Sequence, residues 1–202
     1  MPALETLHEP RPVLGHVNLM MDSFIANADI ADMRAVVRTL LATSPPDVTA
    51  AFHDAARRRL DKMNAKQLSP STQLFSKSSD GFSRPTPELA AVLRRARSLY
   101  GAGMGFASLF LLTQVVRETL GMRWKEDSDT ADVLAHLDAD VTQAIQSSKE
   151  ELAGGRVADL SGARATMGDL QNALIHSDRD AEIRGCESPF ERALASVQYW
   201  KF

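Results

Sequence analysis

A carboxylate, an imidazole and a second carboxylate recur at four-residue spacing in Asp132, His136 and Asp140. On a helix this spacing stacks the three side chains along one face, and side chains of these types can bind a transition metal. An apolar stripe that includes Leu137 and Val141 lies on the opposite face of the same stretch. We therefore expect the Asp132, His136 and Asp140 face to be solvated, and we assign no metal site.

A second acidic cluster, formed by Asp178, Asp180 and Glu182, resembles the opening of a calcium-binding loop. The loop pattern then fails, because Ile183 stands where the loop needs glycine and Pro189 stands where it needs glutamate. We reject a calcium site here. The surrounding segment, HSDRDAEIRG, is expected to be a polar turn in which the preceding helix ends.

The single cysteine, Cys186, follows His176 in the same polar region. A cysteine–histidine pair can act as nucleophile and base, but no neighbouring residue type indicates an activated thiol. No serine lies in a nucleophile elbow. The glycines at 101–105 lack the preceding strand and the following Lys-Ser/Thr pair of a phosphate-binding loop, so they favour a tight turn or close packing of helices. We predict no catalytic residue and no cofactor.

The composition is that of an ordinary globular protein, with 44% hydrophobic residues and a formal net charge of −3 over 202 residues. A generally basic nucleic-acid-binding protein is not indicated, so such an activity would need a local patch. One cysteine cannot form an internal disulfide, which fits a reducing compartment. The N-terminus lacks the features of a signal peptide, and the apolar stretch 104–116 is too short to span a membrane. We expect a cytoplasmic or nuclear protein with no membrane span.

The stretch 106–116 is the most hydrophobic part of the chain. Laid on a helix, its apolar residues, among them Phe106, Phe110, Leu112 and Val116, cover most of the circumference. A helix that is hydrophobic on most sides is normally buried among other elements. The sequence therefore predicts an all-α fold, an irregular helical bundle of about six or seven helices around a central hydrophobic helix at 106–120.

Amphipathic stripes and helix-boundary residues predict the surrounding helices. A capping residue followed by proline begins helices near 46, 87 and 189, and glycine ends helices near 101, 121 and 154. No stretch alternates with period two, so we predict no strand. The remaining helices are expected within about 30–41, 46–66, 87–100, 129–153, 161–174 and 190–200, and a further short helix at 16–25 is left open.

The expected domain organisation is a loosely ordered N-terminus at 1–15 and a single helical domain at 16–202. The domain contains a flexible loop at about 69–85, which is rich in serine and lacks helical or strand periodicity. The loop is open to two interpretations, a tolerated long connection or a segment regulated by phosphorylation.

Our leading functional hypothesis is a non-enzymatic helical protein–protein interaction module, an adaptor or complex subunit. Its candidate partner-binding residues are the aromatic side chains Trp124, Tyr199 and Trp200, which can anchor a partner. The expected partner is another protein. A homodimer is left open, because the stripe along 134–152 has near-heptad spacing and the C-terminus is aromatic.

Two alternatives remain open. The chain could be a nucleic-acid-associated or chromatin-associated protein that uses a basic helical strip, in which case binding would weaken steeply with salt. It could also be an enzyme or small-ligand binder with a pocket inside the bundle. The basic strip consists of Arg58, Arg59, Lys62, Lys66, Arg94, Arg95 and Arg97.

Overall fold

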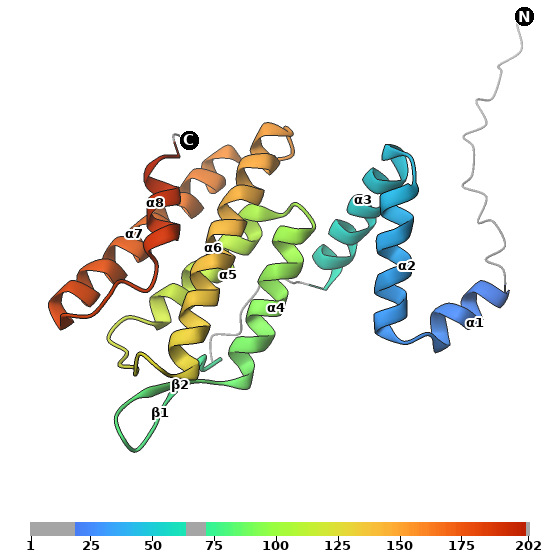
Figure 1. Ribbon diagram of the computed structural model, residues 1–202. Coiled ribbons are helices and arrows are strands. Elements are labelled where there is room, and N and C mark those ends of the chain that lie inside the picture. Colours follow the sequence, from blue (N-terminus) through green and yellow to red (C-terminus); the bar gives the residue numbers. More distant parts are fainter. Residues whose placement is uncertain (1–18, 64–71, 201–202) are drawn as a thin grey trace, which may run out of the picture. The chain divides into compact units, whose positions relative to one another are not determined.

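The computed structural model describes residues 19–63 and 72–200, and within these ranges the chain forms eight α-helices and two short β-strands (Figure 1). The all-α class is confirmed, with more helices than the six or seven that the sequence predicted. No helix in the described ranges is long and apolar enough to cross a membrane. The chain divides into two units, Met1–Ala50 and Ala51–Phe202.

The first unit contains α1 (Leu19–Asn27), α2 (Ile30–Thr43) and the start of α3 (Pro46–Lys62), which continues into the second unit. Two prolines, Pro45 and Pro46, separate α2 from α3. The N–H of Ser44 donates the last backbone hydrogen bond of α2 to the Leu40 carbonyl, and α3 starts two residues later. The predicted loose N-terminus, at 1–15, lies outside the described residues, and so do 16–18 of the short helix left open at 16–25.

The second unit is organised around α5 (Gly105–Glu118), as the sequence predicted. Three helices pack against it, namely α4 (Pro87–Gly101), α6 (Asp129–Ala153) and α7 (Leu160–Arg184) (Figure 1). Phe110 is the exception on α5, because 48% of it is exposed and the helix therefore has one open edge. The aliphatic side chains of α5 that are 0% exposed are Leu109, Leu111, Leu112, Val115 and Val116.

Glycine sets the approach of α5 to α6. A Cβ atom at Gly105 would overlap the backbone of Ser148 on α6, so only glycine fits at this crossing. Two residues earlier, Gly103 has a φ of +73°, the left-handed conformation that lets the chain turn sharply from α4 into α5. The interpretation of 101–105 as a tight turn with close helix packing is confirmed.

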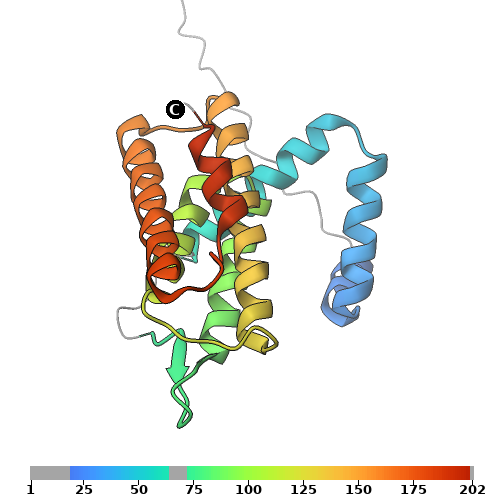
Figure 2. The same ribbon diagram turned by 60° about the vertical axis from the view of Figure 1, so that its left-hand side comes forward.

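The last helix, α8 (Glu191–Gln198), packs on α6 and α7 (Figure 2). Phe190 precedes it and is 1% exposed, while the buried carboxylate of Asp138 on α6 accepts a 2.9 Å hydrogen bond from the backbone N–H of Ala193. A side chain of α6 thus caps the first turn of α8. Burial raises the pKa of the Asp138 carboxyl, and hydrogen bonds from the backbone of Ala193 and Arg192 oppose this rise.

One helix is longer than predicted. The segment HSDRDAEIRG is not a turn, because α7 continues to Arg184 and ends at Gly185 in a left-handed cap with φ +66°. Its buried face is continued by the small residues Ser177 and Ala181, which are 4% and 1% exposed. Small and polar residues on the inner face hid this continuation in the sequence.

The expectation that the chain has no strand is also wrong. β1 (Phe75–Lys77) pairs antiparallel with β2 (Ser83–Pro85), each strand being three residues long. Ser83 fixes the hairpin on the domain, because its N–H donates to the Arg123 carbonyl at 2.7 Å and its own carbonyl accepts from Thr130 Oγ1 at 2.9 Å. Strands this short show no period-two pattern, and contacts distant in sequence hold them.

Of the predicted loop at about 69–85, residues 72–85 are described and contain this hairpin, whereas 69–71 lie outside the described residues.

Candidate functional site

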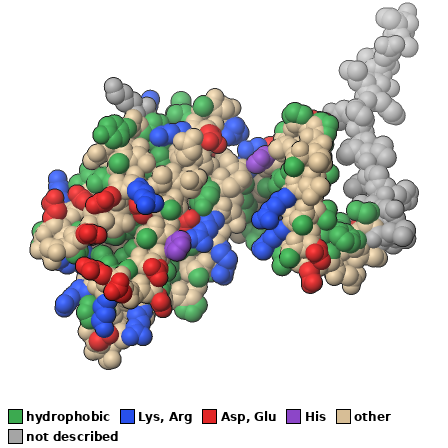
Figure 3. Space-filling model, viewed as in Figure 1, with side chains coloured by type: hydrophobic (Ala, Val, Ile, Leu, Met, Phe, Trp, Pro, Cys, Tyr) green, Lys and Arg blue, Asp and Glu red, His purple; other side chains and the backbone are tan. Residues whose placement is uncertain are grey.

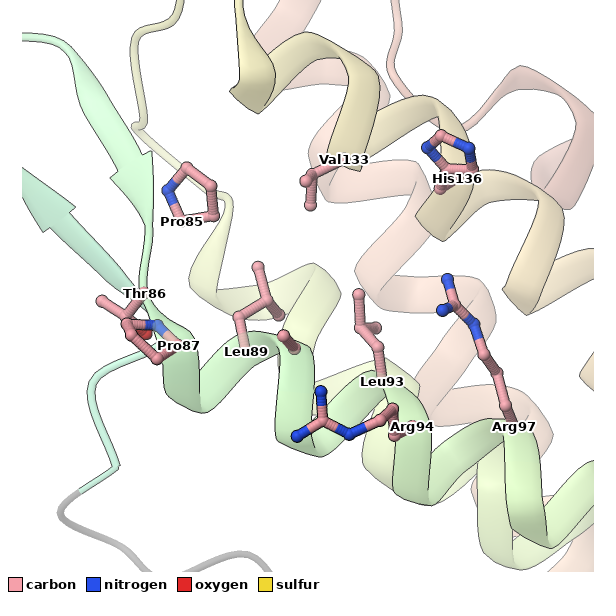
Figure 4. A pocket seen from close by; sticks show the side chains of 10 residues that line it. Pro85, Thr86, Pro87, Leu89, Leu93, Arg94, Arg97, Val133 and His136 are labelled. Atoms are coloured by element: carbon pink, nitrogen blue, oxygen red, sulfur yellow. The ribbon is translucent and has the colours of Figure 1, made fainter. Parts of the chain in front are cut away.

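A groove opens between α4 and α6 next to the end of β2 (Figure 4). Its volume is about 610 Å³, within the range of sites that hold a small ligand or a few side chains. We call it the α4–α6 groove. It is lined by Pro85, Thr86, Pro87, Leu89, Ala90, Leu93, Arg94, Arg97, Val133 and His136.

The floor of the α4–α6 groove is aliphatic. Leu89 and Leu93 rise from α4 toward Val133 on α6, and all three belong to or pack against the main core (Figure 4). The start of α4 is held in place by Thr86, whose hydroxyl donates to the carbonyl of Leu74 at 3.0 Å. Pro87 begins the helix, as its position after a capping residue predicted.

A buried carboxylate fixes one cation at the edge of the groove. Arg97 Nε lies 2.9 Å from both carboxylate oxygens of Asp140, and Arg97 Nη2 lies 2.7 Å from Oδ2. The hydroxyl of Tyr100, one turn along α4, donates to Oδ1 at 3.1 Å. The expected solvation of the Asp132, His136 and Asp140 face is therefore wrong for Asp140, which is 6% exposed.

Within this cluster, Arg97 and Tyr100 are each held in one protonation state. The hydrogen bond to Asp140 raises the pKa of the Arg97 guanidinium, so the side chain stays cationic. Burial raises the pKa of the Tyr100 hydroxyl, and the charge of Asp140 adds to the effect, so the phenol stays protonated and donates. The sequence does contain one signal for this cluster, because Arg97 and Tyr100 are three positions apart and therefore lie on the same side of α4.

Two further nitrogen-bearing side chains line the groove. Arg94 is exposed and forms no ion pair with a described residue. His136 is exposed, and its Nδ1 lies 2.7 Å from the Asp132 carbonyl. Because a carbonyl only accepts, Nδ1 carries the proton and Nε2 is the ring nitrogen left for a guest. Among the described residues no group of three or more His, Cys, Asp or Glu is arranged to hold a metal.

The three predicted aromatic anchors have different surroundings. Trp124 is half-buried on the core, with the Arg184 guanidinium 5.6 Å from its ring centroid. Trp200 also packs on the core, with its ring 6.1 Å from that of Phe106. Tyr199 is 86% exposed, as its position off the apolar face of α8 predicted. Of the three, Tyr199 is the residue that presents its ring to solvent.

The predicted basic strip divides between two helices. Arg58, Arg59 and Lys62 are exposed on α3, whereas Arg94 and Arg97 line the α4–α6 groove and Arg97 is held by Asp140. The α3 cations do not line that groove. Arg95 lies on α4 outside the lining, and Lys66 lies outside the described residues.

The near-heptad stripe on α6 is buried within its own unit. Leu134, Leu137, Val141 and Ile145 are each at most 2% exposed and belong to the main core. Their spacing therefore reflects packing against the helices of the same unit, and this stripe offers no seam for a second copy.

A second groove, of about 820 Å³, lies beside the end of α7 and contains Trp124, Arg184 and the exposed Cys186. His176 does not reach the thiol, because it lies eight positions before Arg184 on α7, about 12 Å along the helix axis. The acidic cluster at 178–182 is helical, and its Asp180 accepts from the Gly121 N–H at 2.9 Å. Neither group forms a reactive site.

In the described part of the first unit, α1 and α2 carry large apolar side chains that are exposed. No residue of α2 is buried, and the hydrophobic side chains of α1 and α2 reach the surface in Figure 3. We call this surface the α1–α2 face. The exposed fractions of its residues are 52% for Met21, 41% for Phe24, 53% for Ile25, 67% for Ile30, 46% for Val36 and 50% for Leu40.

Comparison of the chain with protein-family models, with curated proteins and with solved structures finds no match.

Proposed function

We propose that the chain is a non-enzymatic helical interaction module whose α1–α2 face binds another protein. The observation that carries the proposal is that α2, a helix of 14 residues, has no fully buried side chain, and that only Met33, Val37 and Leu41 among its apolar side chains of Val size or larger are partly buried. Isolated helices of this length are marginal in water, and helices in proteins draw most of their stability from packing of an apolar face. A partner that covers this face would supply that packing.

The sequence pattern of α2 supports a helix-in-groove mode of binding. Ile30, Val37 and Leu41 recur along one side of the helix, with Val36 and Leu40 beside them. Of these, Ile30, Val36 and Leu40 are exposed, whereas Val37 and Leu41 are partly buried. Anchors spaced by three, four and seven residues are those that an amphipathic helix lays into an apolar groove. Contiguous exposed apolar side chains of this kind mark interaction surfaces more often than scattered single ones.

The proposal is tested with two double variants of equal charge and equal spacing. Val36→Asp with Leu40→Asp places two carboxylates on the α1–α2 face, whereas Ala35→Asp with Thr39→Asp places them on the opposite side of the same helix. All four positions tolerate a polar side chain in the chain itself, because each is exposed. Circular dichroism of each variant checks that helix content is unchanged.

The readouts are affinity purification from the protein's own cells with mass spectrometry, and sedimentation of the purified chain. We expect the face variant to lose the proteins that the wild-type chain retains, and the control variant to keep them. Self-association that disappears in the face variant alone would identify the partner as a second copy. A face variant that keeps the same partners and the same sedimentation as the wild-type chain would refute the proposal.

A further inference from the structure

We infer that the α4–α6 groove is a second docking site, which takes a short acidic segment of another protein with a large apolar side chain next to a carboxylate. The inference rests on the proposed function in that the chain binds protein, but it does not depend on the α1–α2 face.

The charge of the lining is one-sided. Two arginines, Arg94 and Arg97, line the groove and no carboxylate does, although Asp140 pairs with Arg97 beside it and the whole chain has a formal net charge of −3. The recorded bonds of Arg97 use Nε and Nη2 toward Asp140, which fixes the direction of the guanidinium. Figure 4 shows Arg97 directed toward the α6 side of the groove, with His136 opposite. A guest carboxylate meets donors on Arg94 and on this fixed guanidinium.

The aliphatic floor of the α4–α6 groove determines which side chain of the bound segment fits beside its carboxylate. Leu89, Leu93 and Val133 form an aliphatic surface, so burying an aliphatic or aromatic side chain on them removes apolar area from water. No Phe, Tyr or Trp lines the groove, so it lacks the large stacking platform on which proteins bind single-stranded nucleic acid. The cations are also too few to follow a phosphate backbone.

The length of the groove fits about three turns of a helix. Along α4 the lining runs from Pro87 to Arg97, ten residues or about 15 Å. An acidic amphipathic segment repeats its apolar side chains over the same distance. The guest would place its apolar anchor between Leu89 and Val133 and its carboxylate at Arg94.

The test begins with random twelve-residue peptides displayed on phage and selected against the immobilised full-length chain. We expect the enriched peptides to pair an Asp or Glu with a Leu, Ile or Phe. Fluorescence anisotropy with the labelled peptides then measures affinity for purified variants. Arg94→Glu should weaken binding roughly tenfold, because attraction becomes repulsion at an exposed rim. A peptide whose carboxylate is replaced by Lys should bind Arg94→Glu more tightly than it binds the wild-type chain.

The controls separate the groove from the rest of the surface. Arg179→Glu makes the same charge change at an exposed position on α7 and should leave affinity within about twofold. Ala90→Trp, at an exposed position on α4, fills the groove and should abolish binding without touching the core. Thermal melts of each variant confirm that it is folded.

Failure of this inference is distinguishable from failure of the proposed function. The Val36→Asp with Leu40→Asp variant should bind the enriched peptides as the wild-type chain does. Selection that yields no acidic peptides, or acidic peptides that bind Arg94→Glu and Arg179→Glu equally well, would overturn the groove assignment. Neither result would alter the expected loss of partners from the α1–α2 face variant.

Discussion

Two residues of α5, separated by one position, differ enough in burial to test whether this helix is the centre of the domain. Leu112 is 0% exposed, whereas Phe110 is 48% exposed. Leu112→Ala removes three carbon atoms from a sealed environment, which costs about 2.4 kcal/mol at about 0.8 kcal/mol per carbon. The cavity left behind raises the expected loss to about 3–4 kcal/mol.

Phe110→Ala removes a larger side chain but should cost less. About half of the ring already meets water, so the lost burial is worth about 1–1.5 kcal/mol, and no closed cavity forms. With a urea dependence of about 2 kcal/mol per molar, the midpoint should fall by about 1.5–2 M for Leu112→Ala and by about 0.5–0.8 M for Phe110→Ala.

The assay is urea unfolding followed by tryptophan fluorescence. Both tryptophans of the chain, Trp124 and Trp200, pack on the core of the second unit, so their emission reports the unfolding of that unit. Equal slopes across the variants are needed before midpoints are compared. A midpoint shift for Leu112→Ala that is no larger than that for Phe110→Ala would refute the placement of α5 at the centre.

Three further substitutions, one of them with a matched control, test the contacts that join the helices. Gly105→Ala forces α5 away from the Ser148 backbone and should destabilise the domain by about 1–3 kcal/mol in urea melts. The control is Gly168→Ala on α7, which has open space around it and should stabilise the domain by about 0.5–1 kcal/mol. A gain in stability at both sites would contradict the close crossing of α5 and α6. Asp138 has a raised pKa, so the wild-type chain binds more protons folded than unfolded between the unfolded and folded pKa values, and its stability relative to Asp138→Asn should fall as pH rises through the interval between those two values; melts across an acidic pH series that show the reverse trend would disprove the sign. Asp140→Ala should lower the free energy of unfolding by about 1–2 kcal/mol. This is less than the loss expected for a fully buried ion pair, because the Arg97 side chain is 44% exposed and regains contact with water. A measured loss above about 3 kcal/mol would show that the ion pair is shielded from water more than this exposure indicates.

The helices of this fold were predictable wherever the side chains themselves carried the pattern. Continuous hydrophobicity located α5, and Thr86-Pro87 located the start of α4. The inner face of α7 beyond residue 174 was not predictable in this way, because Ser177 and Ala181 bury small side chains that a hydrophobic pattern does not register. The hairpin was missed for a different reason, since its three-residue strands depend on hydrogen bonds to residues distant in sequence.

The α4–α6 groove could not be predicted from the sequence, because it depends on which side of α4 faces α6. His136 and Asp140 are four positions apart, yet the first is exposed and the second is buried against Arg97 and Tyr100. A solvated stripe and a half-buried one have the same spacing, and only the packing of the two helices separates them. The partner helix therefore decides which member of a polar stripe becomes part of the structure.

Because a side chain of α6 caps α8, the first turn of α8 depends on a residue that is synthesised much earlier. α8 has eight residues, too few to nucleate a stable helix alone. The carboxylate that completes its first turn belongs to Asp138, 55 positions before the amide that it binds. During synthesis we therefore expect α8 to form only after α6 has docked. In the finished protein the same dependence makes its amides the ones expected to exchange with solvent earliest among the core helices.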